Sequence, residues 1–88
     1  MIREVIQIKN NSGLHARPAA HLVKVAGQFS SDIKILKDGL EVNGKSIMGV
    51  MMLAAEPGSE IEFVIEGADE QAAFQAIVEL IEKKFYEE

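Results

Sequence analysis

The sequence has 88 residues, is 48% hydrophobic and carries a formal net charge of −5 at pH 7. This length favours one domain, residues 1–88, built around one core. The acidic balance argues against sequence-independent binding to DNA or RNA, which requires a basic surface. With no cysteine, disulfides, thiol chemistry and cysteine-ligated metals are excluded. We expect a soluble cytoplasmic protein without membrane insertion, because no segment has the length of an apolar span or the form of a signal peptide.

The first third of the chain predicts a strand, a turn and a helix. Residues 1–9 alternate between apolar and polar positions as in a half-buried strand, although Glu4 interrupts the apolar face. Residues 10–13 have turn chemistry, and a helical repeat then continues to a stop near Gly27. One side of this helix is apolar, with Ala19, Leu22, Val23 and Ala26. The opposite side is polar, with Arg17, His21, Lys24 and Gln28.

The middle of the chain predicts a hairpin followed by a short helix. Asp38-Gly39 is a strong two-residue turn signal between strands at 33–37 and 40–43. Residues 46–53 have room for about two helical turns, and Ser46 is placed to cap them. This helix has more apolar residues than one buried face requires. We expect Val50 and Leu53 in the core and a partly exposed patch drawn from Ile47, Met48 and Met51.

The last third predicts a strand at 60–66, with Ile61, Phe63 and Ile65 facing inward, and a final helix for which Asp69 is a suitable N-cap. The apolar residues that recur at helical spacing there are Phe74, Ile77, Val78, Ile81 and Phe85, with Ala73 and Leu80 beside them. The predicted order is therefore β-α-β-β-α-β-α. Strands with a single buried face favour an α+β fold of two layers, in which helices cover one side of an antiparallel sheet.

The stretch GLHARPAA, from Gly13 to Ala20, carries the candidate chemistry. Proline is tolerated in the first turn of a helix, so Pro18 places His15 at or just before a helix N-terminus. Free N–H groups and the helix dipole favour an anion there, and Arg17 can add a bidentate guanidinium. An imidazole at such a site is a candidate carrier of a phosphoryl group, although a plain surface histidine would have the same local sequence.

GLHARPA at 13–19 resembles the active-site signature of HPr, the histidine-containing phosphocarrier family of the bacterial phosphotransferase system. A second block, KSIMGVMM at 45–52, resembles the family's regulatory serine site. The order and spacing of the remaining elements fit the same family. The resemblance implies an open-faced β-sandwich, in which three helices cover one face of a four-stranded antiparallel sheet.

The resemblance also implies a function. The phosphoryl group would pass from enzyme I, itself charged by phosphoenolpyruvate, to Nδ1 of His15, and then to a histidine on a sugar-specific IIA domain. Arg17 would stabilise the phosphate, and neither a cofactor nor a metal is implied. The protein would act as a carrier rather than as an enzyme. Phosphorylation of Ser46 by an HPr kinase/phosphorylase would link sugar transport to carbon catabolite regulation, with a transcriptional regulator as a further partner.

We predict that a partner-binding surface joins the two helix starts. Arg17 and Lys24 would supply positive charge, and Ile47, Met48 and Met51 would supply apolar contact. Such a mixture suits a monomeric carrier that must bind unrelated partners and release each of them quickly.

Three alternatives stay open at the level of sequence. Within the family, the chain could serve a nitrogen-related regulatory phosphotransferase system, although the Ser46 block favours the carbohydrate branch. Outside it, a ferredoxin-like domain that binds a small ligand has similar β-α-β runs and would not need His15. An autonomous phosphatase or phosphomutase would need a substrate pocket, for which 88 residues leave little room.

Overall fold

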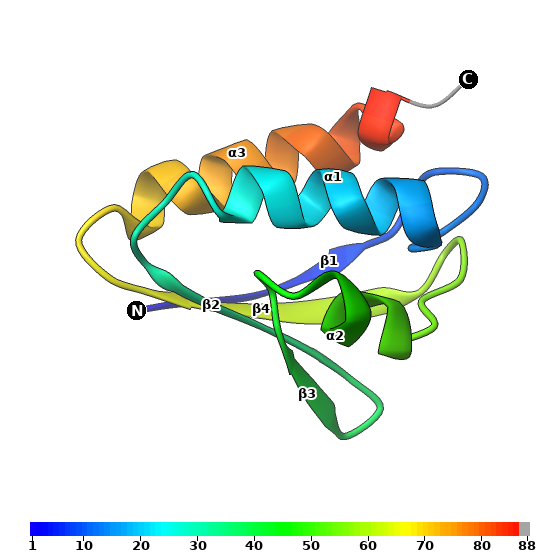
Figure 1. Ribbon diagram of the computed structural model, residues 1–88, viewed down its shortest axis with the longest axis horizontal. Coiled ribbons are helices and arrows are strands. Elements are labelled where there is room, and N and C mark those ends of the chain that lie inside the picture. Colours follow the sequence, from blue (N-terminus) through cyan, green and yellow to red (C-terminus); the bar gives the residue numbers. More distant parts are fainter. Residues whose placement is uncertain (87–88) are drawn as a thin grey trace.

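The computed structural model describes residues 1–86 (Figure 1). Its elements are β1 (Ile2–Gln7), α1 (Ala16–Ala26), β2 (Asp32–Lys37), β3 (Leu40–Asn43), α2 (Ile47–Met52), β4 (Glu60–Glu66), α3 (Glu70–Glu82) and a 3₁₀ turn, η1 (Lys84–Tyr86). The predicted order of strands and helices is confirmed. The hairpin turn also forms as predicted, since Asp38 and Gly39 both have positive φ, 51° and 84°, as the tight turn between β2 and β3 requires.

The four strands form one antiparallel sheet in the order β1-β4-β2-β3. Ile65 of β4 lies opposite Ile2 of β1 on one side and Ile33 of β2 on the other, so the inward-facing residues of neighbouring strands are in register. Helices α1 and α3 lie together over one face of this sheet, and α2 packs against α1 and β3 (Figure 1). The structure is therefore the predicted two-layer, open-faced sandwich.

The core lies between the sheet and the helices, where the predicted inward residues of the strands are buried. Its largest fully buried side chains include Phe63, Ile35, Ile61 and Ile65 from the strands and Leu22, Ile77 and Ile81 from the helices. Val50 and Leu53 anchor α2 in this core, as expected. Val23, Phe74 and Val78 are only partly buried, because they lie at the edge of their helical stripes.

Asp69 is the N-cap residue of α3, but its side chain does not cap that helix. Its carboxylate instead accepts hydrogen bonds from the backbone N–H groups of Ser30 and Ser31, at 2.9 and 3.0 Å, and from the Ser31 hydroxyl. These hydrogen bonds lower the pKa of Asp69 to about 2, and the bond from the Ser31 hydroxyl has the largest effect. The residue expected to act within one helix thus joins the start of α3 to the loop between α1 and β2.

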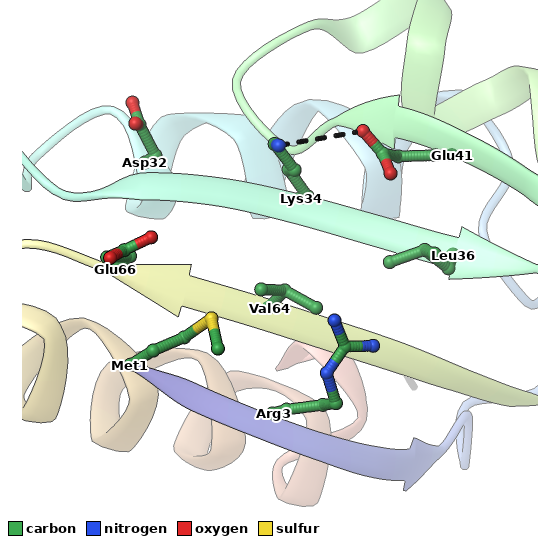
Figure 2. A pocket seen from close by; sticks show the side chains of 8 residues that line it. All are labelled: Met1, Arg3, Asp32, Lys34, Leu36, Glu41, Val64 and Glu66. Carbon is green, nitrogen blue, oxygen red and sulfur yellow. Dashed lines mark ion pairs between the residues drawn. The ribbon is translucent and has the colours of Figure 1, made fainter.

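The opposite face of the sheet carries alternating charged and apolar side chains, and α1, α2 and α3 leave it uncovered (Figure 2). Arg3 pairs with Glu62 at 3.0 Å, and Lys34 pairs with Glu41 at 3.7 Å. Val64 and Met1 contribute to a shallow hollow of about 190 Å³ between these charges. The alternation of the strands therefore provides one buried face and one polar face, as in other antiparallel sheets. Within residues 1–86, no helix has the length and apolar character needed to cross a membrane.

Candidate functional site

His15 is the N-cap residue of α1. Its backbone is extended, with φ −80° and ψ −168°, and its carbonyl accepts the Ala19 N–H at 2.8 Å. Its side chain is exposed and makes no capping hydrogen bond. The first N–H groups of a helix lack intrahelical partners, and Pro18 has no N–H group. The free backbone donors in the first turn are therefore the N–H groups of Ala16 and Arg17. The predicted placement of His15 at a helix start is confirmed.

The loop that carries His15 is docked against the loop that follows α2. The Leu14 N–H donates to the Ala55 carbonyl at 2.8 Å. Gly13 has φ +68°, and a Cβ added to it would lie 2.4 Å from the same carbonyl oxygen, so only glycine fits. The Nδ2 group of the buried Asn10 donates to the Gly13 carbonyl at 2.9 Å. These hydrogen bonds, to Gly13 and from Leu14, therefore fix the loop that leads into His15.

A hollow of about 260 Å³ lies beside His15. It is lined by Leu14, His15, Met51, Ala54, Ala55 and Glu56. The structure thus brings His15 next to Met51, one of the predicted surface residues, at the end of α2. The start of α2 lies elsewhere, since Lys45 beside it contacts Phe29 beyond the end of α1. The surface therefore joins the start of α1 to the end of α2, and the prediction that it joins the two helix starts is wrong.

The loop at 54–56 was expected only to connect two elements, and no local pattern shows that it would border the site. Gly13 is the one sequence feature connected with this contact. Its close approach to the Ala55 carbonyl can be seen only in the folded chain.

Arg17, His21 and Lys24 lie along one side of α1, where they border a shallow depression together with Gln28. Arg17 and Lys24 are exposed, and neither forms an ion pair with another residue of the described part of the chain. The His21 ring packs near the Tyr86 ring, with centroids 5.8 Å apart. His21 therefore has a packing partner in η1, whereas Arg17 and Lys24 leave positive charge on an accessible helix face.

Ser46 is the N-cap residue of α2, as predicted, and its Oγ accepts the Gly49 N–H at 3.1 Å. The neighbouring Lys45 Nζ donates to the Phe29 carbonyl at 2.7 Å and so connects this helix start to the loop that follows α1. The apolar residues of α2 that face solvent are Ile47, Met48, Met51 and Met52, with exposed fractions of 43, 76, 41 and 65%. The first three were predicted, and Met52 enlarges the patch.

Helices α1 and α2 contact each other. The candidate site is therefore an exposed imidazole at a helix N-terminus, with two cations along its own helix and an apolar patch on the neighbouring one.

Comparison with known proteins decides the family. The family model described as the PTS HPr component phosphorylation site matches residues 2–83. The chain belongs to the HPr family. It is 50% identical over 88 residues to the phosphocarrier protein HPr of Treponema pallidum, and the match covers all of both chains. The phosphocarrier proteins of this family act in the phosphotransferase system.

Solved structures of HPr proteins agree with this assignment. The crystal structure of HPr from Thermoanaerobacter tengcongensis has a TM-score of 0.95 and 51% identity, covering 100% of this chain and 99% of that one. A second structure, of an HPr dimer from the same organism, has a TM-score of 0.80 and 50% identity, covering 99% of this chain and 100% of that one. The fold predicted from the HPr resemblance is confirmed, and dimers occur among the relatives of this chain.

Proposed function

We propose that this HPr-family chain carries a phosphoryl group on His15, which it accepts from phosphorylated enzyme I and passes to a histidine of sugar-specific IIA domains. The observation that supports the proposal most directly is the position of His15. Its ring is exposed at the start of α1 and is not used as a cap. An anion attached to this ring would lie at the positive end of the helix dipole.

The reaction requires little beyond positioning. A nitrogen of the neutral imidazole attacks the phosphorus, a new N–P bond forms on His15, and the N–P bond on the donor histidine breaks. The charge of the transferring group spreads over its equatorial oxygens. The N–H groups of Ala16 and Arg17 and the Arg17 guanidinium are the donors that this chain offers to those oxygens. The same steps run in reverse toward an acceptor histidine.

We propose a carrier rather than an autonomous phosphatase or phosphomutase. The hollow beside His15, at about 260 Å³, is smaller than the roughly 300–1,000 Å³ typical of small-molecule sites. A phosphoryl group and one side chain of a partner would fit this volume better than a complete small-molecule substrate would. The remaining catalytic groups would come from the partner, and the exposed patch on α2 supplies a surface on which it can dock.

Ser46 is the proposed regulatory site, with an HPr kinase/phosphorylase as the modifying enzyme and a transcriptional regulator as a downstream partner. A phosphate at this N-cap would be tolerated by the helix, because negative charge is favourable at a helix N-terminus. It would also place charge beside Ile47 and Met48, which are exposed and apolar. The expected result is weaker docking of enzyme I without unfolding. A regulatory serine in this position favours the carbohydrate branch over a nitrogen-related system.

The test replaces His15 and follows labelled phosphate from phosphoenolpyruvate through enzyme I. The His15→Ala variant should fold normally but accept no phosphate, whereas the wild-type chain should form one acid-labile phosphate. His21→Ala is the matched control, because it removes the other histidine of the chain, and it should accept phosphate as the wild type does. Label that persists on His15→Ala, or that maps to His21, would contradict the proposal.

A further inference from the structure

Three of the four methionines in the chain lie in one short helix and face solvent. Met48, Met51 and Met52 have exposed fractions of 76, 41 and 65%. Residues spaced three and four apart are neighbours on a helix surface, so the three side chains form one group. The opposite side of α2 is anchored by Val50 and Leu53, which are 0 and 4% exposed. The sulfurs are therefore accessible without any opening of the core.

This group adjoins the site of phosphoryl transfer. Met51 lines the hollow beside His15, and α2 as a whole packs against α1. A chemical change at these side chains would thus alter the surface on which a partner meets His15. The same change would leave the hydrogen bonds that hold the His15 loop, between Leu14 and Ala55 and between Asn10 and Gly13, in place.

The chain contains no cysteine, so no thiol competes with the thioethers for an oxidant. A peroxide transfers one oxygen atom to the sulfur. The O–O bond breaks, an S=O bond forms, the sulfur is oxidised to a sulfoxide, and hydrogen peroxide is reduced to water. The product is polar and chiral where the original side chain was apolar and flexible, and methionine sulfoxide reductases reverse the change.

We propose that Met48, Met51 and Met52 form a reversible oxidation site, at which a peroxide weakens the docking of phosphotransfer partners. The inference rests on the proposed function, because it requires that partners dock over α2. Burial of a sulfoxide oxygen without a hydrogen-bond donor is costly, whereas burial of the thioether is favourable. Oxidation would then act on association with the partner and not on the reactivity of His15.

Met1 provides an internal comparison. It is 68% exposed, as accessible as the methionines of α2, but it lies on the open face of the sheet beside Arg3 and Val64 (Figure 2). Peroxide should oxidise it as well. Its sulfoxide would lie away from the candidate site, so we expect the change to have no effect on transfer.

The experiment treats the full chain with hydrogen peroxide and locates the sulfoxides by peptide mass spectrometry. Phosphoryl transfer from enzyme I is then measured over a range of concentrations of this protein. Oxidation should raise the apparent KM at least about tenfold, the effect of one poorly paired polar group in an interface, and should leave kcat nearly unchanged. Treatment with methionine sulfoxide reductases should restore the original KM.

Two variants are the controls. The triple variant Met48→Leu, Met51→Leu and Met52→Leu keeps an apolar surface of similar volume, and its KM should not respond to peroxide. Met1→Leu should respond as fully as the wild type. The inference is overturned if the oxidised wild type keeps its KM, or if the triple variant loses transfer as strongly as the wild type. An untreated wild type that accepts no phosphate would overturn the proposed function as well, which separates the two failures.

Discussion

The imidazole of His15 takes no part in capping α1, because backbone groups make the hydrogen bonds at this helix start. The carbonyl of His15 accepts the first intrahelical bond, and its ring makes no capping bond. Gly13 and Asn10 hold the preceding loop from outside the helix. A ring that makes no capping hydrogen bond could gain and lose a charged group without weakening the helix start, which supports the proposed role of His15 as a carrier.

At the same scale, Arg17 should support transfer and not folding. Its side chain is exposed and lacks an ion pair within residues 1–86. Arg17→Ala should slow transfer from enzyme I by about tenfold or more, the effect of losing one charge-assisted donor, while the melting temperature stays nearly constant. Arg17→Lys keeps the charge but loses the planar guanidinium, so its transfer rate should lie between those of the wild type and Arg17→Ala. An unchanged rate for Arg17→Ala would remove it from the mechanism.

At the scale of the element, the Ser46 hydroxyl has one structural role and one proposed regulatory role. It caps α2 through Gly49 and is the proposed acceptor of a regulatory phosphate. Ser46→Ala removes the cap and should lower the free energy of unfolding by about 1 kcal/mol. Ser46→Asp retains a good capping residue, so it should keep most of the stability and instead weaken binding to enzyme I. Chemical unfolding and a binding titration of both variants check this. Equal binding by wild type and Ser46→Asp would contradict the regulatory proposal.

The contact between Asp69 and the loop at Ser30 and Ser31 is a second element-scale feature, because it joins α3 to the entry of β2. The pKa of Asp69 is lowered from 3.8 to about 2 in the folded chain. A lowered carboxyl pKa means that the stabilisation is fully present above the ordinary pKa and is lost as the pH falls through the folded value. Acid should therefore weaken this junction between about pH 4 and pH 2.

We predict that Asp69→Asn is less stable than the wild type at neutral pH, and that the difference shrinks as the pH falls from about 4 toward 2. Melting temperatures measured across this range provide the test. Asp32→Asn, which removes one exposed carboxylate from the open face of the sheet, is the control for the change in net charge. A stability difference for Asp69→Asn that does not depend on pH would contradict the assignment.

At the scale of the whole molecule, the sheet has two faces with different roles. One face is covered by α1 and α3, and the candidate site lies at the ends of α1 and α2. The other face is open and carries paired charges (Figure 2). On an acidic chain, Arg17 and Lys24, which form no ion pair within residues 1–86, would help to steer an acidic partner toward His15.

This arrangement predicts where enzyme I binds. Met48→Asp should weaken binding at least about tenfold, because a charge would be buried without a partner, and Lys24→Glu should slow association most at low salt. Met1→Asp and Lys34→Glu make the same changes on the open face and should have little effect. A titration that follows amide shifts residue by residue locates the surface. Shifts confined to the sheet face or to α3, with none at 46–51, would rule this surface out.

The sequence by itself determined the elements and their local signals. Alternation placed Ile61, Phe63 and Ile65 in the core, and residues with specific dihedral or capping preferences fixed the Asp38-Gly39 turn and the Ser46 cap. These preferences act within a few residues, so they can be identified without a fold. His15 could be placed at a helix start for the same reason, since the proline three residues later marks the first turn.

Only the tertiary structure decided the strand order β1-β4-β2-β3, the docking of Gly13 against Ala55 and the partners of Asp69. Local preference predicted Asp69 as a cap for its own helix, but the N–H groups of Ser30 and Ser31 lie within its reach once the chain has folded. Likewise, nothing near residues 54–56 indicates that they border His15. Contacts between segments far apart in the chain depend on burying all apolar faces at once, and that requirement acts on the whole molecule rather than on any one stretch of sequence.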